Sequence, residues 1–468
     1  MTILKPSRYF ALAGFLPVGV VFVMVLFEYT GHSAFAVAAS VLAAIAVAIF
    51  SFGVRASRVV FVLIAIALVL WAALTNTGWM AATALAAERG AMVMALFAAL
   101  TAIRNAAISA PAIVECGRFL ARQRSGLRYT ALTIGGHLFA LVLLYGSISL
   151  LGILATESTA REPDPEIRRQ RTRRMMIAIQ RGFASTLCWS PLGFSMIISV
   201  SVVPGASWGA AALPGLVSAL MMLVIGWSLD ALYKPQVKSN TRPLETERWV
   251  TQLRPLLVLL GLVLVGVALL HTVTGVEVIG AVMSLIPVIA ILWIAMQQPP
   301  VGLTRSVNVR QRALLFVTRE LPSYRGEIVL LFMAGFIGSL GAFLLVPLVQ
   351  AQGLDLTTIP PWIIVAAMVW IIPVTGQLGM NPILAVSLLV PILPSPEVMG
   401  IPSTAMVVAI TAGWALSGAT SPFTASVMLA ASLGGVSPLR AGLGWNGVYV
   451  LAAGAALTLW ALSLFYIL

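Results

Sequence analysis

Long apolar runs constrain this chain more than any other feature of its sequence. Three of them follow one another near the start, at residues 10–27, 33–54 and 59–75. An α-helix needs about 20 apolar residues, each adding roughly 1.5 Å, to cross the hydrocarbon layer of a membrane. These runs are apolar on every face, whereas a membrane-spanning β-strand alternates polar and apolar residues. The sequence therefore predicts an all-α polytopic membrane protein.

The charged residues agree with this fold class. Only 9% of the residues are charged, against about 25% in soluble domains. The net charge of +13 comes from Lys and Arg in short segments between apolar runs, where the positive-inside rule places them. We therefore expect no nucleic-acid partner. Cys116 and Cys188 lie in or beside apolar runs and have neither disulfide nor metal-ligand spacing, so we expect no metal and no cofactor.

The basic segments also predict the topology. If Lys5 and Arg8 lie on the cytoplasmic side of a bacterial inner membrane, the later basic clusters fall on that side after successive crossings. The count gives eleven spans, with basic loops at 157–181 and 234–254 among those on the cytoplasmic side. The predicted spans are 10–27, 33–54, 59–75, 90–117, 182–203, 209–229, 256–270, 278–296, 328–348, 401–433 and 445–468.

Two further apolar stretches fit hairpins better than crossings. Residues 129–156 lie between two basic clusters that both favour the cytoplasm, so we predict a re-entrant hairpin with Gly135, Gly136 and Gly146 at its bend. Residues 362–394 are flanked only by acidic residues, which predicts a second hairpin that opens to the outside. The expected tips are 133–137 and 375–382.

Polar side chains at these tips are candidates for a ligand path. His137, Gln377 and Asn381 would lie at membrane depth, where an unpaired polar group is unfavourable and often marks a functional site. His137 either takes up a proton during coupling, since its ordinary pKa is near 6.5, or stays neutral and donates to a carbonyl.

An internal repeat links the two halves. Residues 182–195 align with 413–426 without a gap, and identical pairs include Gly182/Gly413, Ser190/Ser421, Pro191/Pro422 and Ser195/Ser426. Each copy follows a predicted hairpin, and the charge count runs the first outward and the second inward. This is the inverted repeat typical of secondary transporters. Proline removes a backbone donor, so we expect both spans to break near Ser190 and Ser421 and to expose backbone groups to a solute. A packed helix that merely kinks is the alternative.

Two charged residues in the fourth predicted span have local interpretations. Arg104 either extends to the interface, pairs with a helix end or binds a solute carboxylate. Glu115 lies close to a cluster that includes Arg118 and Arg122, and we expect it to pair with that cluster.

Eleven spans, two opposed hairpins, an inside N-terminus and an outside C-terminus resemble the ion transporter superfamily. This group includes divalent anion/sodium symporters, citrate carriers and relatives of arsenite antiporters. The resemblance implies a site between hairpin tips and broken spans, and a homodimer that moves transport domains against a scaffold. The positions that match this pattern are Gly136, His137, Ser190, Pro191, Gln377, Asn381, Thr420, Ser421 and Pro422.

The domain assignment follows from the same resemblance. We assign residues 1–80 to scaffold helices and 81–230 to a first transport repeat. Residues 231–326 hold cytoplasmic loops and scaffold helices of the second repeat, and 327–468 form the second transport repeat. The tips lack the Ser-Asn-Thr signature of the sodium–dicarboxylate branch, so the coupling ion stays open between Na⁺ and H⁺.

The function predicted from these features is secondary active transport of a small anionic solute by alternating access. The expected partners are this solute and membrane lipids. The alternatives are a membrane-embedded transferase acting on a lipid-linked substrate, or a channel. The sequence shows no paired carboxylates, no His-Glu-x-x-His motif and no repeated pore filter. We therefore expect a protein without catalytic residues, not an enzyme.

Overall fold

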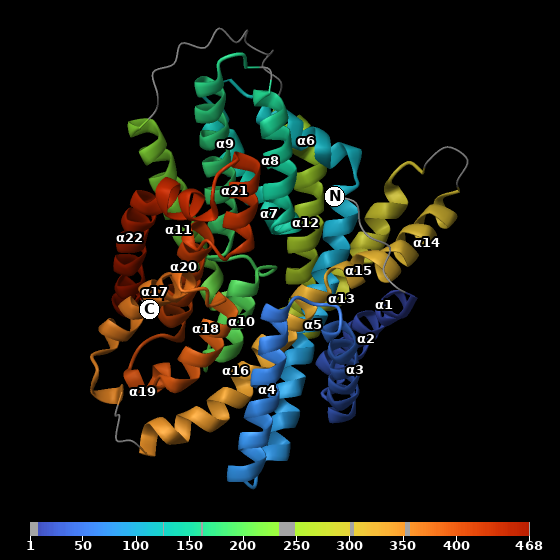
Figure 1. The fold of residues 1–468 in the computed structure, drawn as a ribbon, viewed down its shortest axis with the longest axis vertical. Helices are drawn as coiled ribbons and strands as arrows, with labels where there is room; N and C mark the ends of the chain where they lie inside the picture. Colours follow the sequence, from blue (N-terminus) through green and yellow to red (C-terminus); the bar gives the residue numbers. More distant parts are fainter. Residues whose placement is uncertain are drawn as a thin grey trace. The chain divides into compact units, whose positions relative to one another are not determined.

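The computed structural model describes residues 8–124, 126–160, 162–233, 249–299, 304–351 and 356–467. The regular elements of these ranges are helices (Figure 1). Ten helical segments are long and apolar enough to cross a membrane, and each overlaps one of the predicted spans. The remaining prediction, 182–203, falls on a helix that is interrupted. The all-α, multi-pass membrane fold is therefore confirmed. Of the loop expected at 234–254, residues 234–248 lie outside the described residues, and 249–254 belong to helix α12 (Trp249–Thr274) instead.

The chain divides into two compact units. Unit 1 comprises Met1–Ala107, Gly261–Leu354 and Ser387–Ile392, and unit 2 comprises Ile108–Leu260, Asp355–Val386 and Leu393–Leu468. Both units draw on distant parts of the chain, and α5, α12 and α18 contribute residues to both. All positions of the expected site lie in unit 2.

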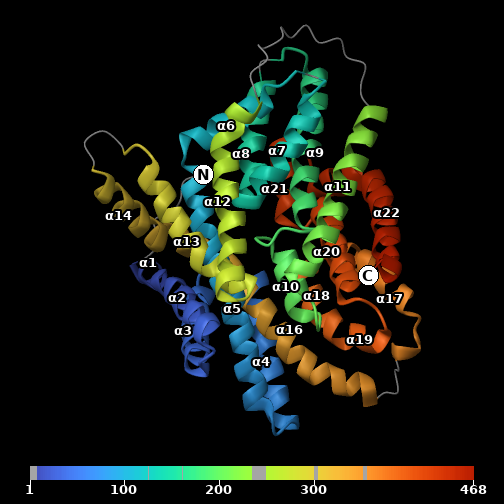
Figure 2. The same ribbon diagram turned by 180° about the vertical axis from the view of Figure 1, so that it is seen from behind.

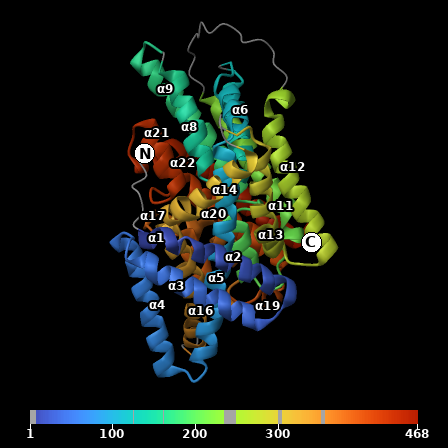
Figure 3. The same cartoon turned by 90° about the vertical axis from the view of Figure 1, so that its right-hand side faces the viewer.

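Unit 1 contains mostly long apolar helices. Helices α2 and α3 pack on each other (Figure 3), and α4 packs on α16. Arg104 lies over the ring of Tyr324, 5.2 Å from its centroid. The elements are α1 (Arg8–Ala13), α2 (Phe15–Thr30), α3 (Ser33–Ser51), α4 (Ala56–Thr75), α5 (Trp79–Ile108), α13 (Val278–Met296), α14 (Arg305–Leu315), the π-helix η1 (Phe316–Glu320), α15 (Leu321–Ser323), α16 (Arg325–Ala351), the 3-10 helix η3 (Val390–Ile392) and the second part of α12 (Trp249–Thr274).

Unit 2 is built around two helices made largely of buried residues. All of 175–186 in α9 and all of 404–420 in α20 are buried. Small residues such as Ala, Gly, Ser and Thr dominate α20 and let its neighbours approach closely. The elements are α6 (Pro111–Ala121), α7 (Arg128–Leu143), α8 (Gly146–Thr159), α9 (Pro165–Thr186), α10 (Phe194–Val202), α11 (Trp208–Leu232), the first part of α12, the 3-10 helix η2 (Leu356–Thr358), α17 (Pro361–Gln377), α18 (Pro382–Leu389), α19 (Pro396–Met399), α20 (Ser403–Thr420), α21 (Ala425–Gly434), the π-helix η4 (Arg440–Gly444) and α22 (Trp445–Ile467).

The fourth predicted span, 90–117, has wrong boundaries. Helix α5 begins already at Trp79 and ends at Ile108, and α6 then starts at Pro111. Proline restricts the residue before it to an extended conformation, and Ala110 has φ −84° and ψ 116°. The proline therefore ends one helix and begins the next. Glu115 forms the expected ion pair with Arg118, which confirms that prediction.

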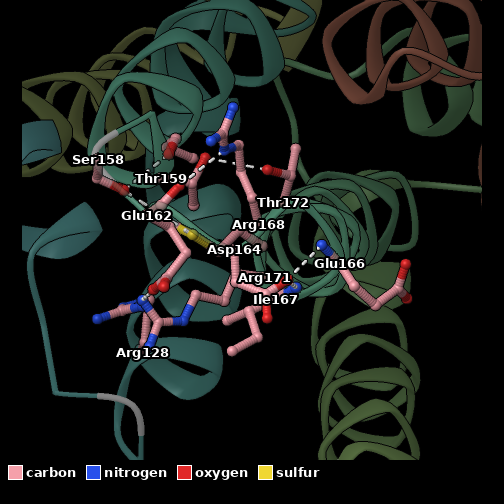
Figure 4. A network of polar contacts seen from close by, with 12 residues as sticks. Arg128, Ser158, Thr159, Glu162, Asp164, Glu166, Ile167, Arg168, Arg171 and Thr172 are labelled. Atoms are coloured by element: carbon pink, nitrogen blue, oxygen red, sulfur yellow. Dashed lines mark hydrogen bonds and ion pairs between the residues drawn. The ribbon is translucent and has the colours of Figure 1, made fainter. Parts of the chain in front are cut away.

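The predicted basic loop 157–181 is mostly helix. Helix α9 begins at Pro165, and Asp164 caps it by accepting hydrogen bonds from the N–H groups of Glu166 (2.8 Å) and Ile167 (3.2 Å). An aspartate at the cap and a proline in the first turn are strong helix-start signals. Figure 4 shows how Arg168 and Arg171 reach back to Glu162 in the turn between α8 and α9. The arginines thus lie on the first turns of α9.

Each predicted hairpin segment forms two helices joined by a short connection, but only one connection lies where the sequence predicts the tip. Helices α17 and α18 are joined by residues 378–381, where Gly379 has φ 90°, as predicted. Helices α7 and α8 are joined by Leu144 and Tyr145, so the tip predicted at 133–137 is wrong. Of the three glycines expected at the bend, only Gly146 adjoins it. Gly136 lies inside α7, where an added Cβ would be 2.6 Å from the carbonyl oxygen of Ile179 in α9. The glycine permits close helix packing instead of a bend.

Candidate functional site

Two helix breaks form the centre of the candidate site. Helix α9 ends at Thr186 and α10 begins at Phe194, and Ser190 and Pro191 lie in the gap. Helix α20 ends at Thr420 and α21 begins at Ala425, with Ser421 and Pro422 between them. Both helices are interrupted rather than only kinked, as the sequence predicts.

The two breaks share the same hydrogen bonds. In each, the serine before the proline accepts from the backbone N–H two residues later, and a serine five residues further on donates to the carbonyl oxygen eight residues before it. The pairs are Leu192 N to Ser190 Oγ (3.2 Å), Phe423 N to Ser421 Oγ (3.3 Å), Ser195 Oγ to Leu187 O (2.5 Å) and Ser426 Oγ to Gly418 O (2.6 Å). The aligned segments therefore share local structure as well as sequence.

The tip of the second hairpin contacts the second break. Ser421 Oγ donates to the carbonyl oxygen of Gly376 at 2.6 Å. A Cβ at Gly376 would lie 2.5 Å from Ser417 Oγ, so a larger residue here would require the Ser417 side chain to move. Gln377 Oε1 and Ser417 Oγ are buried and have no hydrogen-bond partner among the described residues. Unpaired buried polar atoms are unfavourable and mark places where a ligand or ion can bind.

The other predicted residues near the second break are occupied by local hydrogen bonds. Asn381 Oδ1 accepts from the N–H of Ile383 at 2.9 Å, at the start of α18. Thr420 Oγ1 donates to the carbonyl oxygen of Leu416 at 2.8 Å. These side chains shape the break and the tip, and each retains further hydrogen-bonding capacity.

His137 lies beside the first break, although not at a hairpin tip. Its Nε2 accepts from Trp189 Nε1 (3.2 Å), and its Nδ1 is 2.7 Å from Ser185 Oγ. The two rings stack at 6.0 Å, and Trp189 is part of the break. Because Nε2 accepts, a neutral ring carries its proton on Nδ1 and donates it to Ser185. The arrangement satisfies a neutral histidine, with a hydroxyl as acceptor in place of the expected carbonyl.

The two broken helices are joined by a buried amide network. The break leaves the last carbonyls of α20 without intrahelical partners, and Gln180 Nε2 from α9 donates to one of them, Ala419 O, at 3.1 Å. Asn446 Nδ2 from α22 donates to Ala419 O (3.4 Å), Gln180 Oε1 (3.2 Å) and Ala441 O (3.2 Å). The end of α20 is thus tied to α9 and α22.

Sequence reasoning missed Arg181, the most deeply buried cation next to this network. It is only 6% exposed. Its Nε donates to Asn446 Oδ1 (2.9 Å), and its Nη1 donates to the Tyr129 hydroxyl (3.1 Å) and to Gly226 O (3.3 Å). Its guanidinium group lies 4.3 Å from the centroid of the Tyr449 ring. One signal was available: Arg181 directly precedes the repeat that starts at Gly182, so it belongs to the span and not to a loop.

The described side chains around the two breaks do not form a metal-binding group. The described residues contain no group of three or more His, Cys, Asp or Glu side chains that could hold a metal ion. The site consists of hydroxyl groups, amides, helix ends and one buried arginine. Such groups can bind a solute or ion reversibly and contain no evident catalytic acid–base pair.

Two solved transporters share this fold. The YdaH transporter of Alcanivorax borkumensis, described as having an unusual topology, matches with a TM-score of 0.56 and 15% identity over 86% of this chain and 98% of that one. MtrF of Neisseria gonorrhoeae, which is described as illuminating a class of antimetabolite efflux pumps, matches with a TM-score of 0.56 and 12% identity over 88% and 96%. No protein-family model and no curated protein matches the sequence. The likeness shows a transporter fold, and membership of the ion transporter superfamily stays a prediction.

Proposed function

We propose that this protein is a secondary transporter of a small anionic solute, which it moves by alternating access at the two helix breaks. The observation that carries the proposal is the pair of equivalent breaks, tied together by Gln180 and Ala419 O and contacted by a hairpin tip through Ser421. We infer that the two copies form an inverted repeat, with unit 2 as the transport domain and unit 1 as the scaffold of a homodimer. Interrupted helices at a repeat interface are a recurring way to build a transport site.

An anionic solute fits the charges of the site. Helices α10 and α21 begin directly after the breaks, and helix N-termini carry a partial positive charge that favours anions. We place the protein in a bacterial inner membrane with its N-terminus in the cytoplasm, and either Na⁺ or H⁺ drives transport.

Transport is a better explanation than the alternatives. The two solved proteins named above are described as a transporter and as illuminating a class of efflux pumps, which disfavours a transferase acting on lipid-linked substrates. The tight contact between Ser421 and the tip at Gly376 suits a carrier that closes on its solute better than an open channel. Because MtrF is described with antimetabolite efflux pumps, antimetabolites belong among the solutes tested.

Thermal unfolding of the purified protein tests this proposal first. Carboxylates, inorganic oxyanions and antimetabolites are each added with Na⁺, with K⁺ and at two pH values. A ligand that binds only the folded state adds about 2.7 kcal/mol at a hundredfold excess over its Kd, so a true solute raises the melting temperature. Dependence on Na⁺ or on pH identifies the coupling ion.

Counterflow in proteoliposomes then separates a carrier from a channel. Vesicles preloaded with the unlabelled solute should transiently accumulate labelled solute, because an alternating carrier exchanges one molecule for another. A channel gives equilibration without accumulation. No melting shift with any solute, together with no counterflow, would overturn the proposal.

A further inference from the structure

Unit 2 contains a second polar site that the helix breaks do not explain. A pocket of about 720 Å³ lies among α7, α9, α11 and α22 (Figure 2 shows α9, α11 and α22 together). Arg181 lies five residues before α9 ends at Thr186, so more than one helical turn separates it from the first break. Its lining includes Tyr129 and five charged residues, which are Glu166, Arg173, Arg174, Arg181 and Asp230.

Arg181 gives this pocket a buried positive charge. A buried cation is unfavourable unless it is paired, yet the groups that Arg181 contacts are an amide oxygen, a hydroxyl, a carbonyl and an aromatic ring. These bonds use Nε and Nη1. Nη2 has no hydrogen bond to any other described residue. A donor of the buried guanidinium therefore remains available to a ligand.

The two acidic residues of the lining already have partners. Asp230 accepts two hydrogen bonds from Arg174, both at 2.6 Å. Glu166 pairs at 2.9 Å with Arg169, which is not among the lining residues. Arg173 lines the pocket, is exposed, and forms no ion pair or hydrogen bond with a described residue. Arg173 and Arg181 thus remain as uncompensated positive charges.

We propose that this pocket binds an oxyanion, a carboxylate or a phosphate group, with Arg181 as the deep ligand and Arg173 as the ligand at the entrance. Arginine recognises both groups through charge-assisted, often paired hydrogen bonds. The ligand is either a free solute or an anionic lipid headgroup, because both present the same chemistry. The proposal does not depend on transport at the breaks.

Binding at Arg181 has a direct structural route to the second break. The same Asn446 side chain accepts from Arg181 Nε at 2.9 Å and donates to Ala419 O at the end of α20. A ligand that draws the guanidinium group toward the pocket therefore changes the hydrogen bonding of a residue that caps the broken helix. One side chain separates the proposed oxyanion from the α20 break.

Binding to the full-length protein tests the proposal with two kinds of probe. The first is inorganic phosphate, compared with chloride at matched ionic strength in a thermal-unfolding titration in detergent. The second is phosphatidylglycerol, compared with phosphatidylcholine, in nanodiscs that contain the protein. We expect saturable stabilisation by phosphate, by phosphatidylglycerol or by both. Phosphate alone identifies a soluble ligand, and phosphatidylglycerol alone identifies a headgroup.

Three variants locate the effect. Arg173→Gln should weaken binding about tenfold or more, because it removes one charged hydrogen bond to the ligand. Arg173 is exposed, so the substitution should leave the fold intact. Arg181→Gln should abolish binding, and Arg173→Gln remains decisive if that variant does not fold. Arg168→Gln is the control for charge on α9, because it removes the same charge from the same helix outside the pocket. It also removes the hydrogen bond to Glu162 O, so its melting temperature without ligand serves as its own baseline.

Two results would overturn the proposal. One is that neither phosphate nor phosphatidylglycerol stabilises the protein. The other is an equal loss in Arg168→Gln and Arg173→Gln, which would show a general effect of charge on α9. Binding is measured without transport, so a failed counterflow experiment would not affect the proposed oxyanion site. A failed titration would likewise not affect the carrier proposal, which counterflow tests.

Discussion

Replacing Gly182 by alanine should force α7 and α9 apart and destabilise unit 2. A Cβ at this position would lie within 3.0 Å of the Thr133 carbonyl oxygen and 2.9 Å from the backbone nitrogen of His137. Both atoms belong to the backbone of α7, so no side-chain rotation can relieve the contact. Gly413 occupies the same position in the second copy, where a Cβ would lie 2.6 Å from Met368 O.

The expected loss follows from the crowding and the helix preference. Overpacking a close contact costs about 1–3 kcal/mol, and we expect the upper end for Gly182 because its Cβ would approach the carbonyl more closely than that of Gly413. Alanine recovers about 1 kcal/mol as the better helix former. The net loss should be about 2 kcal/mol for Gly182→Ala and about 1 kcal/mol for Gly413→Ala.

Thermal unfolding of the purified variants measures this effect. Gly447→Ala is the matched control, because Gly447 lies in α22 and nothing comes within 4 Å of its added Cβ. It should leave the melting temperature unchanged or raise it. If Gly182→Ala proves as stable as Gly447→Ala, the close packing of α7 on α9 inferred here is wrong.

Three further perturbations test individual contacts. Ser421→Ala removes the hydrogen bond to Gly376 O and should cost about 1–3 kcal/mol, with slower counterflow; full activity would exclude this contact from transport. His137→Phe should lower the melting temperature but leave the pH profile of transport unchanged, because both ring nitrogens already have partners; a flattened profile would instead assign proton coupling to it. Burial raises the pKa of the Cys116 thiol, and the thiolate is the reactive form. Maleimide labelling of Cys116, read by mass spectrometry, should therefore be slow at pH 7 and become faster toward alkaline pH. Rapid labelling at pH 7 would contradict the buried position.

The predictable part of the fold depended on local signals. The apolar runs located the spans, because about 20 consecutive apolar residues are typical of a membrane-spanning helix. Ser-Pro pairs located both breaks, because proline cannot continue a helix without losing a hydrogen bond. The tip at 378–381 was found because Gly379 and Pro382 mark a turn within a single short segment.

The remaining part depended on contacts between distant segments. Gly135 and Gly136 have the composition of a bend, but Gly136 accommodates the carbonyl of Ile179, so the chain turns instead at Leu144 and Tyr145. The basic first turns of α9 resembled a loop, although the Asp164 cap and Pro165 were readable helix-start signals.

The role of Arg181 was the least predictable feature of the site. Its partner Asn446 lies 265 residues away in the sequence, and the ring beneath its guanidinium group comes from Tyr449 in the same helix. No local pattern records such a contact. Its position directly before the repeat assigns Arg181 to the span, but only the folded chain shows which residues it contacts.

Two-sided cysteine accessibility tests alternating access at the breaks most directly. Cysteine is introduced singly at Ser190 or Asn381 after replacement of Cys116 and Cys188, and an impermeant maleimide is applied to vesicles of each orientation. We predict that the maleimide labels each cysteine from both sides of the membrane. A condition that increases labelling from one side should decrease labelling from the other. A transported solute should protect the cysteine from labelling. Labelling from one side only under every condition, or a simultaneous increase on both sides as in an open pore, would contradict the account.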